Sequence, residues 1–406
     1  MDMETDVLIA GGGQVGLALG VALRRAAPLL GVVLVDAVPP DAATREGRAS
    51  TIVAGGRKML EQLGVWRAIA DAAQPVTEMI VTDSRTRDIV RPVFLTFDTE
   101  GTAHVVADGV VVTVLRKAAA EAGVVIVAPE SVTDFVADGA RVTAKLKGDG
   151  SVSARLLVAA DGVRSKLRDV AGIATAGHQY GQTGIVATVA HAKPHDGRAE
   201  EHFLPGGPFA MLPLADTEGG KHRSSLVWTE PTEVAARLLA GDALIFRIEL
   251  ERRFGNRLGP IEVIGKPLAF PLGVTLAREF VRPRFALVGD AAHSIHPIAG
   301  QGLNLGYRDV AALAETVVEA HRLGLDIGAL TTLERYQRWR RYDTVEMAAA
   351  TDALNALFAN DNAALRLLRD VGLRIVDRLP GLKRMFIGEA SGDTESAPKL
   401  LRGEAI

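Results

Sequence analysis

A glycine-rich turn near the amino terminus constrains the fold of this chain more than any other feature. Residues 5–10 have the apolar character of a short buried strand, and an Ala- and Leu-rich helix extends to about Arg25. Between them lies a Gly-x-Gly-x-x-Gly turn. A strand, this turn and a helix, in that order, form a dinucleotide-binding unit, because successive glycines make the tight turn, admit a pyrophosphate and let the helix pack on the strand. These glycines are Gly11, Gly13 and Gly16.

An acidic residue follows at the position that such a unit uses. The second predicted strand covers residues 32–35 and ends at Asp36, twenty positions after Gly16. A carboxylate at this strand end can accept hydrogen bonds from a ribose. An isolated glycine motif is weak, but this context makes it specific, so we predict an α/β fold with a nucleotide-binding sheet.

Two later strands also end in acidic turns. The run 156–160 leads into Asp161-Gly162, and the run 285–288 leads into Gly289-Asp290. A second glycine turn, with Gly300 and Gly302, then opens a helix at Leu303 and Asn304, where unpaired N–H groups favour negative charge. The alternative is ordinary strand-to-helix structure, with Asp161 or Ser165 as a helix cap.

The composition limits the chemistry. The 406 residues include no cysteine, which excludes disulfides, thiolate catalysis and cysteine-ligated zinc, so any redox chemistry must come from a cofactor. The nine histidines show no metal-binding spacing, and we predict no metal site. A net charge of −3 gives no reason to expect nucleic acid as a partner.

No segment has the features of a signal peptide or a membrane span. The apolar run at residues 7–23 is preceded by acidic residues rather than by a basic region. We therefore expect a cytoplasmic protein, either free or peripheral on the inner membrane. The basic, helical region at residues 330–388 has the pattern of a helix that lies on an anionic membrane. A helix that caps the domain or joins a homodimer has the same pattern, and we favour this second interpretation.

The distribution of predicted strands, turns and motifs along the chain suggests three regions. Segments 76–99 and 179–277 contain short predicted strands separated by Gly- and Pro-rich turns, typical of a substrate-binding sheet. Segments 1–75, 100–178 and 278–330 carry the nucleotide motifs and are predicted to form one discontinuous domain. Residues 331–406 form the predicted carboxyl-terminal helical region.

The three acidic motifs together resemble those of the group A flavoprotein aromatic hydroxylases with the p-hydroxybenzoate hydroxylase fold. The segments 47–49, 207–214 and 296–309 are most similar to those of ubiquinone-biosynthesis hydroxylases of the 2-octaprenyl-6-methoxyphenol hydroxylase type. The resemblance spans nearly the whole chain. It implies a Rossmann-like FAD-binding domain of the glutathione-reductase type, an inserted mixed or antiparallel β-sheet domain for the substrate, and a carboxyl-terminal helical segment.

The resemblance also assigns roles to residues. It places Arg48 and Pro297 beside the flavin ring and makes His296 a candidate proton handler, although a structural histidine before proline fits as well. This chain differs from the family at Val112-Thr113, where the family usually has an Asn/Gln-Arg pair. Arg116 is the candidate to replace the FAD contact of that pair. The implied FAD-binding residues are Gly11, Gly13, Gly16, Asp36, Arg48, Asp161, Gly162, Gly289, Asp290, Gly300, Gly302, Leu303 and Asn304.

The implied reaction is the hydroxylation of a polyprenylated phenol in ubiquinone biosynthesis. NAD(P)H would reduce FAD, O2 would form a C4a-hydroperoxyflavin, and one oxygen atom would pass to the aromatic ring. Two alternatives stay open from the sequence: the same chemistry on a small soluble phenol, and a non-catalytic flavoprotein subunit of a biosynthetic complex.

Overall fold

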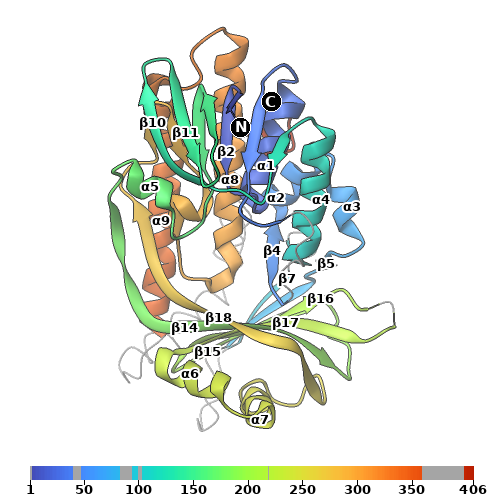
Figure 1. Cartoon of the computed structure of the whole chain (residues 1–406). Coiled ribbons are helices and arrows are strands. Elements are labelled where there is room, and N and C mark those ends of the chain that lie inside the picture. Colours follow the sequence, from blue (N-terminus) through green and yellow to red (C-terminus); the bar gives the residue numbers. More distant parts are fainter. Residues whose placement is uncertain (1, 40–46, 83–93, 99–102, 218, 359–396) are drawn as a thin grey trace.

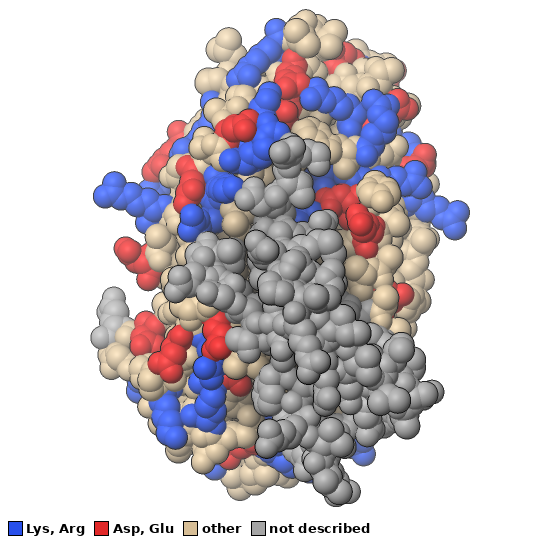
Figure 2. Space-filling view, turned by 180° about the vertical axis from the view of Figure 1, so that it is seen from behind, with Lys and Arg blue, Asp and Glu red and all other residues tan. Residues whose placement is uncertain are grey.

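A computed structural model describes the chain except residues 1, 40–46, 83–93, 99–102, 218 and 359–396. It contains an α/β layer and a large, mostly antiparallel sheet below it (Figure 1). Charged side chains of both signs are interspersed over the described part of the face in Figure 2. None of the described helices has the length and hydropathy needed to cross a bilayer.

The α/β layer is built on a six-stranded sheet with the order β19-β20-β13-β2-β3-β9. All its neighbours pair in parallel except β19 and β20. Its central strands are buried along their whole length, which explains their uninterrupted apolar sequences. The strands are β2 (Val7–Ala10), β3 (Val32–Val35), β9 (Val125–Val127), β13 (Leu156–Ala159), β19 (Val281–Arg282) and β20 (Phe285–Leu287).

Helices cover this sheet and connect its strands. The first, α1 (Gln14–Ala26), follows the glycine turn and packs against α4 (Asp108–Glu121) and α8 (Gln301–Arg322). Helix α8 is buried along most of its length, and α9 (Leu330–Phe358) packs beside it. The predicted α/β fold is confirmed. The predicted helical region at 330–388 is helical as far as Phe358, beyond which it lies outside the described residues.

A smaller four-stranded sheet, β1-β12-β11-β10, flanks the α/β layer. A tight hairpin joins β10 to β11, since Asp138 pairs with Arg141 in an antiparallel register. Phe135 stacks on Phe285 at a ring distance of 4.9 Å and so joins this sheet to the nucleotide-binding sheet. Its strands are β1 (Asp2–Glu4), β10 (Val132–Asp138), β11 (Arg141–Leu146) and β12 (Ser151–Ala154).

The large sheet has eight strands in the order β21-β18-β14-β17-β16-β15-β6-β7. One face packs on α6 (Thr232–Ala240) and α7 (Ala243–Phe254), where Phe209 and Trp228 are fully buried. The other face is turned toward the α/β layer (Figure 1). The strands are β6 (Glu78–Thr82), β7 (Phe94–Asp98), β14 (Thr175–His191), β15 (Arg198–Leu204), β16 (Gly207–Leu214), β17 (His222–Pro231), β18 (Ile261–Ala277) and β21 (His293–Ser294).

A three-stranded sheet, β4-β8-β5, lies between the two layers. Short helices and single-turn segments complete the described chain. These elements are β4 (Ala49–Val53), α2 (Ala54–Gln62), α3 (Trp66–Ala70), β5 (Gln74–Pro75), β8 (Ala103–Ala107), α5 (Lys166–Val170), η1 (Gly289–Ala291), η2 (Ile298–Gly300) and α12 (Lys399–Arg402). The domain boundaries given above stay a prediction.

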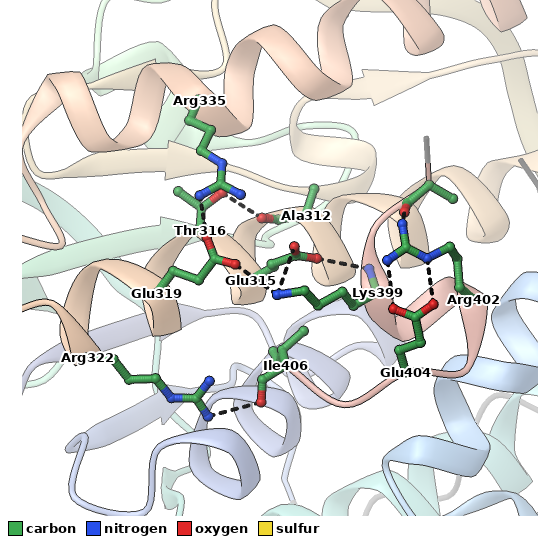
Figure 3. Close-up of polar contacts among 11 residues, drawn as sticks. Ala312, Glu315, Thr316, Glu319, Arg322, Arg335, Lys399, Arg402, Glu404 and Ile406 are labelled. Carbon is green, nitrogen blue, oxygen red and sulfur yellow. Dashed lines mark hydrogen bonds and ion pairs between the residues drawn. The ribbon is translucent and has the colours of Figure 1, made fainter. Parts of the chain in front are cut away.

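The last ten residues return to the α/β layer. Helix α12 packs against α2 and α8, and Leu401 is only 3% exposed there. Figure 3 shows Lys399 reaching Glu315 and Glu319 of α8; its ammonium nitrogen lies 2.9 Å from Glu319 Oε1. Arg322 donates to the Ile406 carbonyl at 3.0 Å. The last residues of the chain therefore contact α8 and are expected to stabilise it.

Replacing Leu401 by alanine is expected to lower the free energy of unfolding by about 2–4 kcal/mol, because it empties a buried apolar site. Urea unfolding of equally FAD-loaded samples measures this. Leu325→Ala is the matched control, since Leu325 is 53% exposed. Equal midpoints for the two variants would show that the terminus does not stabilise α8.

Candidate active site

A cavity of about 1050 Å³ lies between the carboxyl edge of the parallel sheet and the inner face of the eight-stranded sheet. Pockets for drug-sized ligands measure roughly 300–1,000 Å³, so this one is at the large end of that range and suits a large ligand such as a dinucleotide. Both layers contribute lining residues, among them Gly13, Asp290, Leu303, Ala210 and Val227.

The glycine turn behaves as its sequence predicts. Gly11 has a φ of 119°, and a Cβ there or on Gly16 would overlap a backbone carbonyl oxygen. A Cβ on Gly13 would meet nothing, because this residue faces the cavity at the start of α1. No acidic residue lies in the first turn of α1, so its N–H groups present an uncompensated positive end to the cavity. A pyrophosphate fits this end.

Asp36 lies beside this turn and is already paired. Arg116 of α4 donates to Asp36 Oδ2 at 2.5 Å, and Val38 N donates to the other carboxylate oxygen at 3.2 Å. Thr113 also lines the cavity, but its hydroxyl donates to Gly109 O within the helix. Arg116 is therefore the cation held at this end, at the place where the usual Asn/Gln-Arg pair is missing.

The Asp161-Gly162 turn divides between the cavity and a helix. Gly162 lines the cavity with a φ of 87°. The Asp161 carboxylate accepts a hydrogen bond from Leu167 N at 3.3 Å, at the start of α5, while Ser165 caps that helix by accepting from Arg168 N at 3.0 Å. A cofactor role for Asp161 stays a prediction, and the contacts of its side chain favour the structural alternative.

The Gly289-Asp290 turn presents its acid to the cavity. Gly289 has a φ of 58°, which favours glycine, and its N–H donates to Asp309 Oδ2 at 2.8 Å. Asp290 lines the cavity, where surrounding protein raises the pKa of its carboxyl group even though His293 and Arg48 oppose the change. Asp290 is an exposed residue that borders the cavity.

Asp309, on α8, is a residue whose role the sequence did not reveal. It is fully buried, His293 Nε2 lies 2.6 Å from its Oδ2, and Arg340 Nε donates to its Oδ1 at 2.8 Å. Burial alone would raise the pKa of Asp309, but His293 and Arg340 hold it below its usual value. Asp309 lies four residues from both Leu305 and Leu313, so a carboxylate on an apolar helix face was the available signal.

The start of α8 forms the opposite wall. Gly300 has a φ of 63°, Gly302 has open space where a Cβ would stand, and both line the cavity with Pro297 and Leu303. The Asn304 side chain instead joins α8 to β4: its amide donates to Thr51 O at 2.9 Å, and its oxygen accepts from Val53 N at 3.2 Å. Its predicted cofactor contact would have to come from its backbone.

Arg48 lines the cavity from the segment just before β4. Its Nε lies 3.4 Å from Asp108 Oδ2, and its guanidinium carbon is 5.2 Å from the centre of the Phe270 ring. Ser50 donates to the same aspartate at 2.6 Å. Arg48 is therefore held between the two layers with part of its surface open to the cavity.

His296 points away from the cavity that its neighbours Ile295 and Pro297 line. It is fully buried, its ring lies 5.1 Å from that of Tyr180, and neither ring nitrogen has a hydrogen-bond partner. Burial lowers the pKa of His296 to about 4, so the ring is neutral at neutral pH. This geometry favours the structural interpretation over proton handling.

Comparison with known proteins identifies the family. Residues 4–342 match the family model described as FAD binding domain. The chain belongs to this family. It is similar to the ubiquinone hydroxylase UbiL of Rhodospirillum rubrum, with 41% identity over 99% of this chain and 94% of that protein. It is also similar to the 3-demethoxyubiquinol 3-hydroxylase of Escherichia coli, with 33% identity over 96% of this chain and 99% of that protein.

Solved structures agree on the fold. The p-nitrophenol 4-monooxygenase PnpA of Pseudomonas putida superposes with a TM-score of 0.79 over 97% of this chain and 99% of that one, at 20% identity. The protein is an FAD-dependent monooxygenase, and NAD(P)H is the usual reductant of its family. The open glycine turn at Gly13 and the uncompensated end of α1 fit FAD.

Replacing Arg116 by glutamine is expected to weaken FAD binding by about ten- to a hundred-fold, because the buried Asp36 would lose its charged partner. Titration of apoprotein with FAD, followed by flavin fluorescence, measures this. Lys145→Gln is the control, since Lys145 is exposed on β11 and does not line the cavity.

Titration with FMN adds a second control, because FMN lacks the adenosine half and its affinity should not change. If Arg116→Gln binds FAD as Lys145→Gln does, the Asp36–Arg116 pair has no part in holding the adenosine end.

Proposed function

We propose that the protein hydroxylates the aromatic ring of a polyprenylated phenol in ubiquinone biosynthesis, using FAD, NAD(P)H and O2. Two relatives that cover nearly the whole chain, at 41% and 33% identity, are named for hydroxylation in this pathway. The proposal adds the substrate to the family's chemistry.

The observation that carries the proposal is the continuity of the cavity. It runs as one cavity from the glycine turn of α1, in the α/β layer, to the inner face of the eight-stranded sheet. The sheet end is mainly apolar, which suits an aromatic ring with a hydrocarbon tail. The lining residues on this side include Met79, Val186, Ala210, Leu212 and Val227.

The protein's own groups have separate tasks in this proposal. The N–H groups at the start of α1 hold the pyrophosphate, and those near Gly302 and Leu303 favour negative charge at the flavin ring. Pro297 and the apolar sheet face exclude water from the ring side. FAD supplies the transfer of electrons from NAD(P)H and the activation of O2.

Access to a prenylated substrate is the reason to propose peripheral association with the inner membrane. A hydrocarbon tail of that kind partitions into the bilayer, because each buried methylene is worth about 0.8 kcal/mol. Self-association as a homodimer, or assembly into a biosynthetic complex, belongs to the same proposal and is tested by the size of the purified protein with and without detergent.

Deletion of the gene is expected to stop ubiquinone synthesis and to accumulate one prenylated phenol that lacks the added hydroxyl group. Mass spectrometry of quinone intermediates measures this, and the accumulated compound names the missing step. The wild-type gene should restore ubiquinone. Gly13→Val should not, because its side chain would occupy the cavity at the pyrophosphate position while open space there preserves folding.

Intact ubiquinone in the deletion strain would contradict the proposal and favour a small soluble phenol. A purified protein that binds FAD but shows no substrate-stimulated NAD(P)H oxidation would favour the non-catalytic subunit instead.

A further inference from the structure

The inner face of the eight-stranded sheet carries one row of side chains across four strands. Glu201 of β15 pairs with Ala210 of β16, Ala210 pairs with Val227 of β17, and Val227 pairs with Val186 of β14. Directly paired residues point to the same face of a sheet, and all four line the cavity. The row is apolar except at Glu201.

Adjacent glutamates on β15 face opposite ways, as strand geometry requires. Glu200 faces the α6–α7 side, where it contacts Arg257 and lies 3.7 Å from His202. Glu201 is 5% exposed and faces the cavity. Among the described residues of this sheet that line the cavity, Glu201 is the only ionisable one. A second polar group on this face is Thr229, two residues beyond Val227 on β17.

The neighbour of Glu201 on the row leaves space above the sheet. Ala210 has the smallest side chain that a strand residue other than glycine can present, and larger side chains, Val227 and Val186, continue the row beyond it. A flat ring lying on Ala210 would have its edge beside the Glu201 carboxylate. Neighbouring strands are about 4.8 Å apart, so a side chain on the adjacent strand is within reach of that ring's substituents.

We propose that the Glu201 carboxylate accepts the hydrogen bond of a hydroxyl group on the substrate ring. This inference rests on the proposed function and adds the group that recognises the ring. A carboxylate that accepts this bond orients the ring and draws the hydroxyl proton toward itself, which raises electron density at the ring carbons that take up oxygen. The substrate class is therefore a phenol with a free hydroxyl group.

The test is a binding comparison on FAD-loaded protein. The two probes are 4-hexylphenol and its methyl ether, in which a methyl group replaces the hydroxyl hydrogen that Glu201 would accept. Each is titrated while the flavin absorption spectrum is recorded, in the wild type, Glu201→Leu, Glu201→Gln and Thr229→Val. Thr229→Val is the control, because it removes a polar group from the same face without touching Glu201.

The wild type should bind the phenol about ten- to a hundred-fold more tightly than the ether, which is the value of a hydrogen bond to a charged group. Glu201→Leu should reduce this preference to about two-fold or less. Glu201→Gln should keep part of it, since an amide oxygen still accepts, and Thr229→Val should keep all of it. FAD content, measured for each variant, confirms that a variant is folded.

A preference that survives in Glu201→Leu, or one that is lost in Thr229→Val, would overturn the proposal. A wild type that binds both probes equally, or neither, would overturn it too. The outcome is separate from that of the gene deletion, because a protein acting on a different phenol would still show the preference and its loss in Glu201→Leu.

Discussion

The Asp309 carboxylate is the group on which the candidate active site most depends. It is buried, and its two oxygen atoms form hydrogen bonds with three groups. The Gly289 N–H and the His293 ring contact Oδ2, and the Arg340 guanidinium contacts Oδ1. The first of these bonds holds Gly289 in the conformation that presents Asp290 to the cavity. The other two offset the cost of burying the charge. Arg340 also contacts Asp343, to which Arg308 donates at 2.7 Å, so α8 and α9 are joined by one ionic network.

This network ties the two layers together at the cofactor end of the cavity. His293 belongs to β21, which pairs with β18 of the eight-stranded sheet, whereas Asp309 belongs to the central helix of the α/β layer. The hydrogen bond between them is therefore an interlayer contact next to the Gly289-Asp290 turn. Because the cavity lies between the layers, its width depends on contacts of this kind. Asn304 adds a contact between α8 and β4, a strand of the three-stranded sheet that lies between the layers.

The sequence was sufficient for those parts of the site that depend on backbone shape. Gly11, Gly13 and Gly16 could be assigned because a tight turn, a close approach and a close helix crossing each demand glycine at a fixed spacing. The parallel strands could be predicted because strands buried on both faces are continuously apolar. Asp290 followed from its position at a strand end.

Side-chain direction could not be predicted in the same way. Three residues stand in motifs that line the cavity, yet their side chains have other contacts. Asp161 accepts a hydrogen bond from the start of α5, and His296 packs against Tyr180. Asn304 joins α8 to β4. The partners of Asp309 could not be predicted from the sequence, because Arg340 lies thirty-one residues farther along the chain. Glu200 and Glu201 point to opposite faces of the sheet, and the strand register decides which of them faces the cavity. That register depends on pairing partners that a single sequence does not reveal.

The pH dependence of stability in Asp309→Asn tests the central role of this carboxylate most directly. The pKa of Asp309 is lowered in the folded protein, so its stabilisation is present above the unfolded value of 3.8 and is lost as pH falls toward the lower folded pKa. Urea unfolding should therefore show the wild type more stable by about 3–5 kcal/mol near neutral pH, with FAD affinity also reduced in the variant. The difference should shrink as pH falls below about 4. A difference that is small at neutral pH, or that stays constant down to acid pH, would contradict the account.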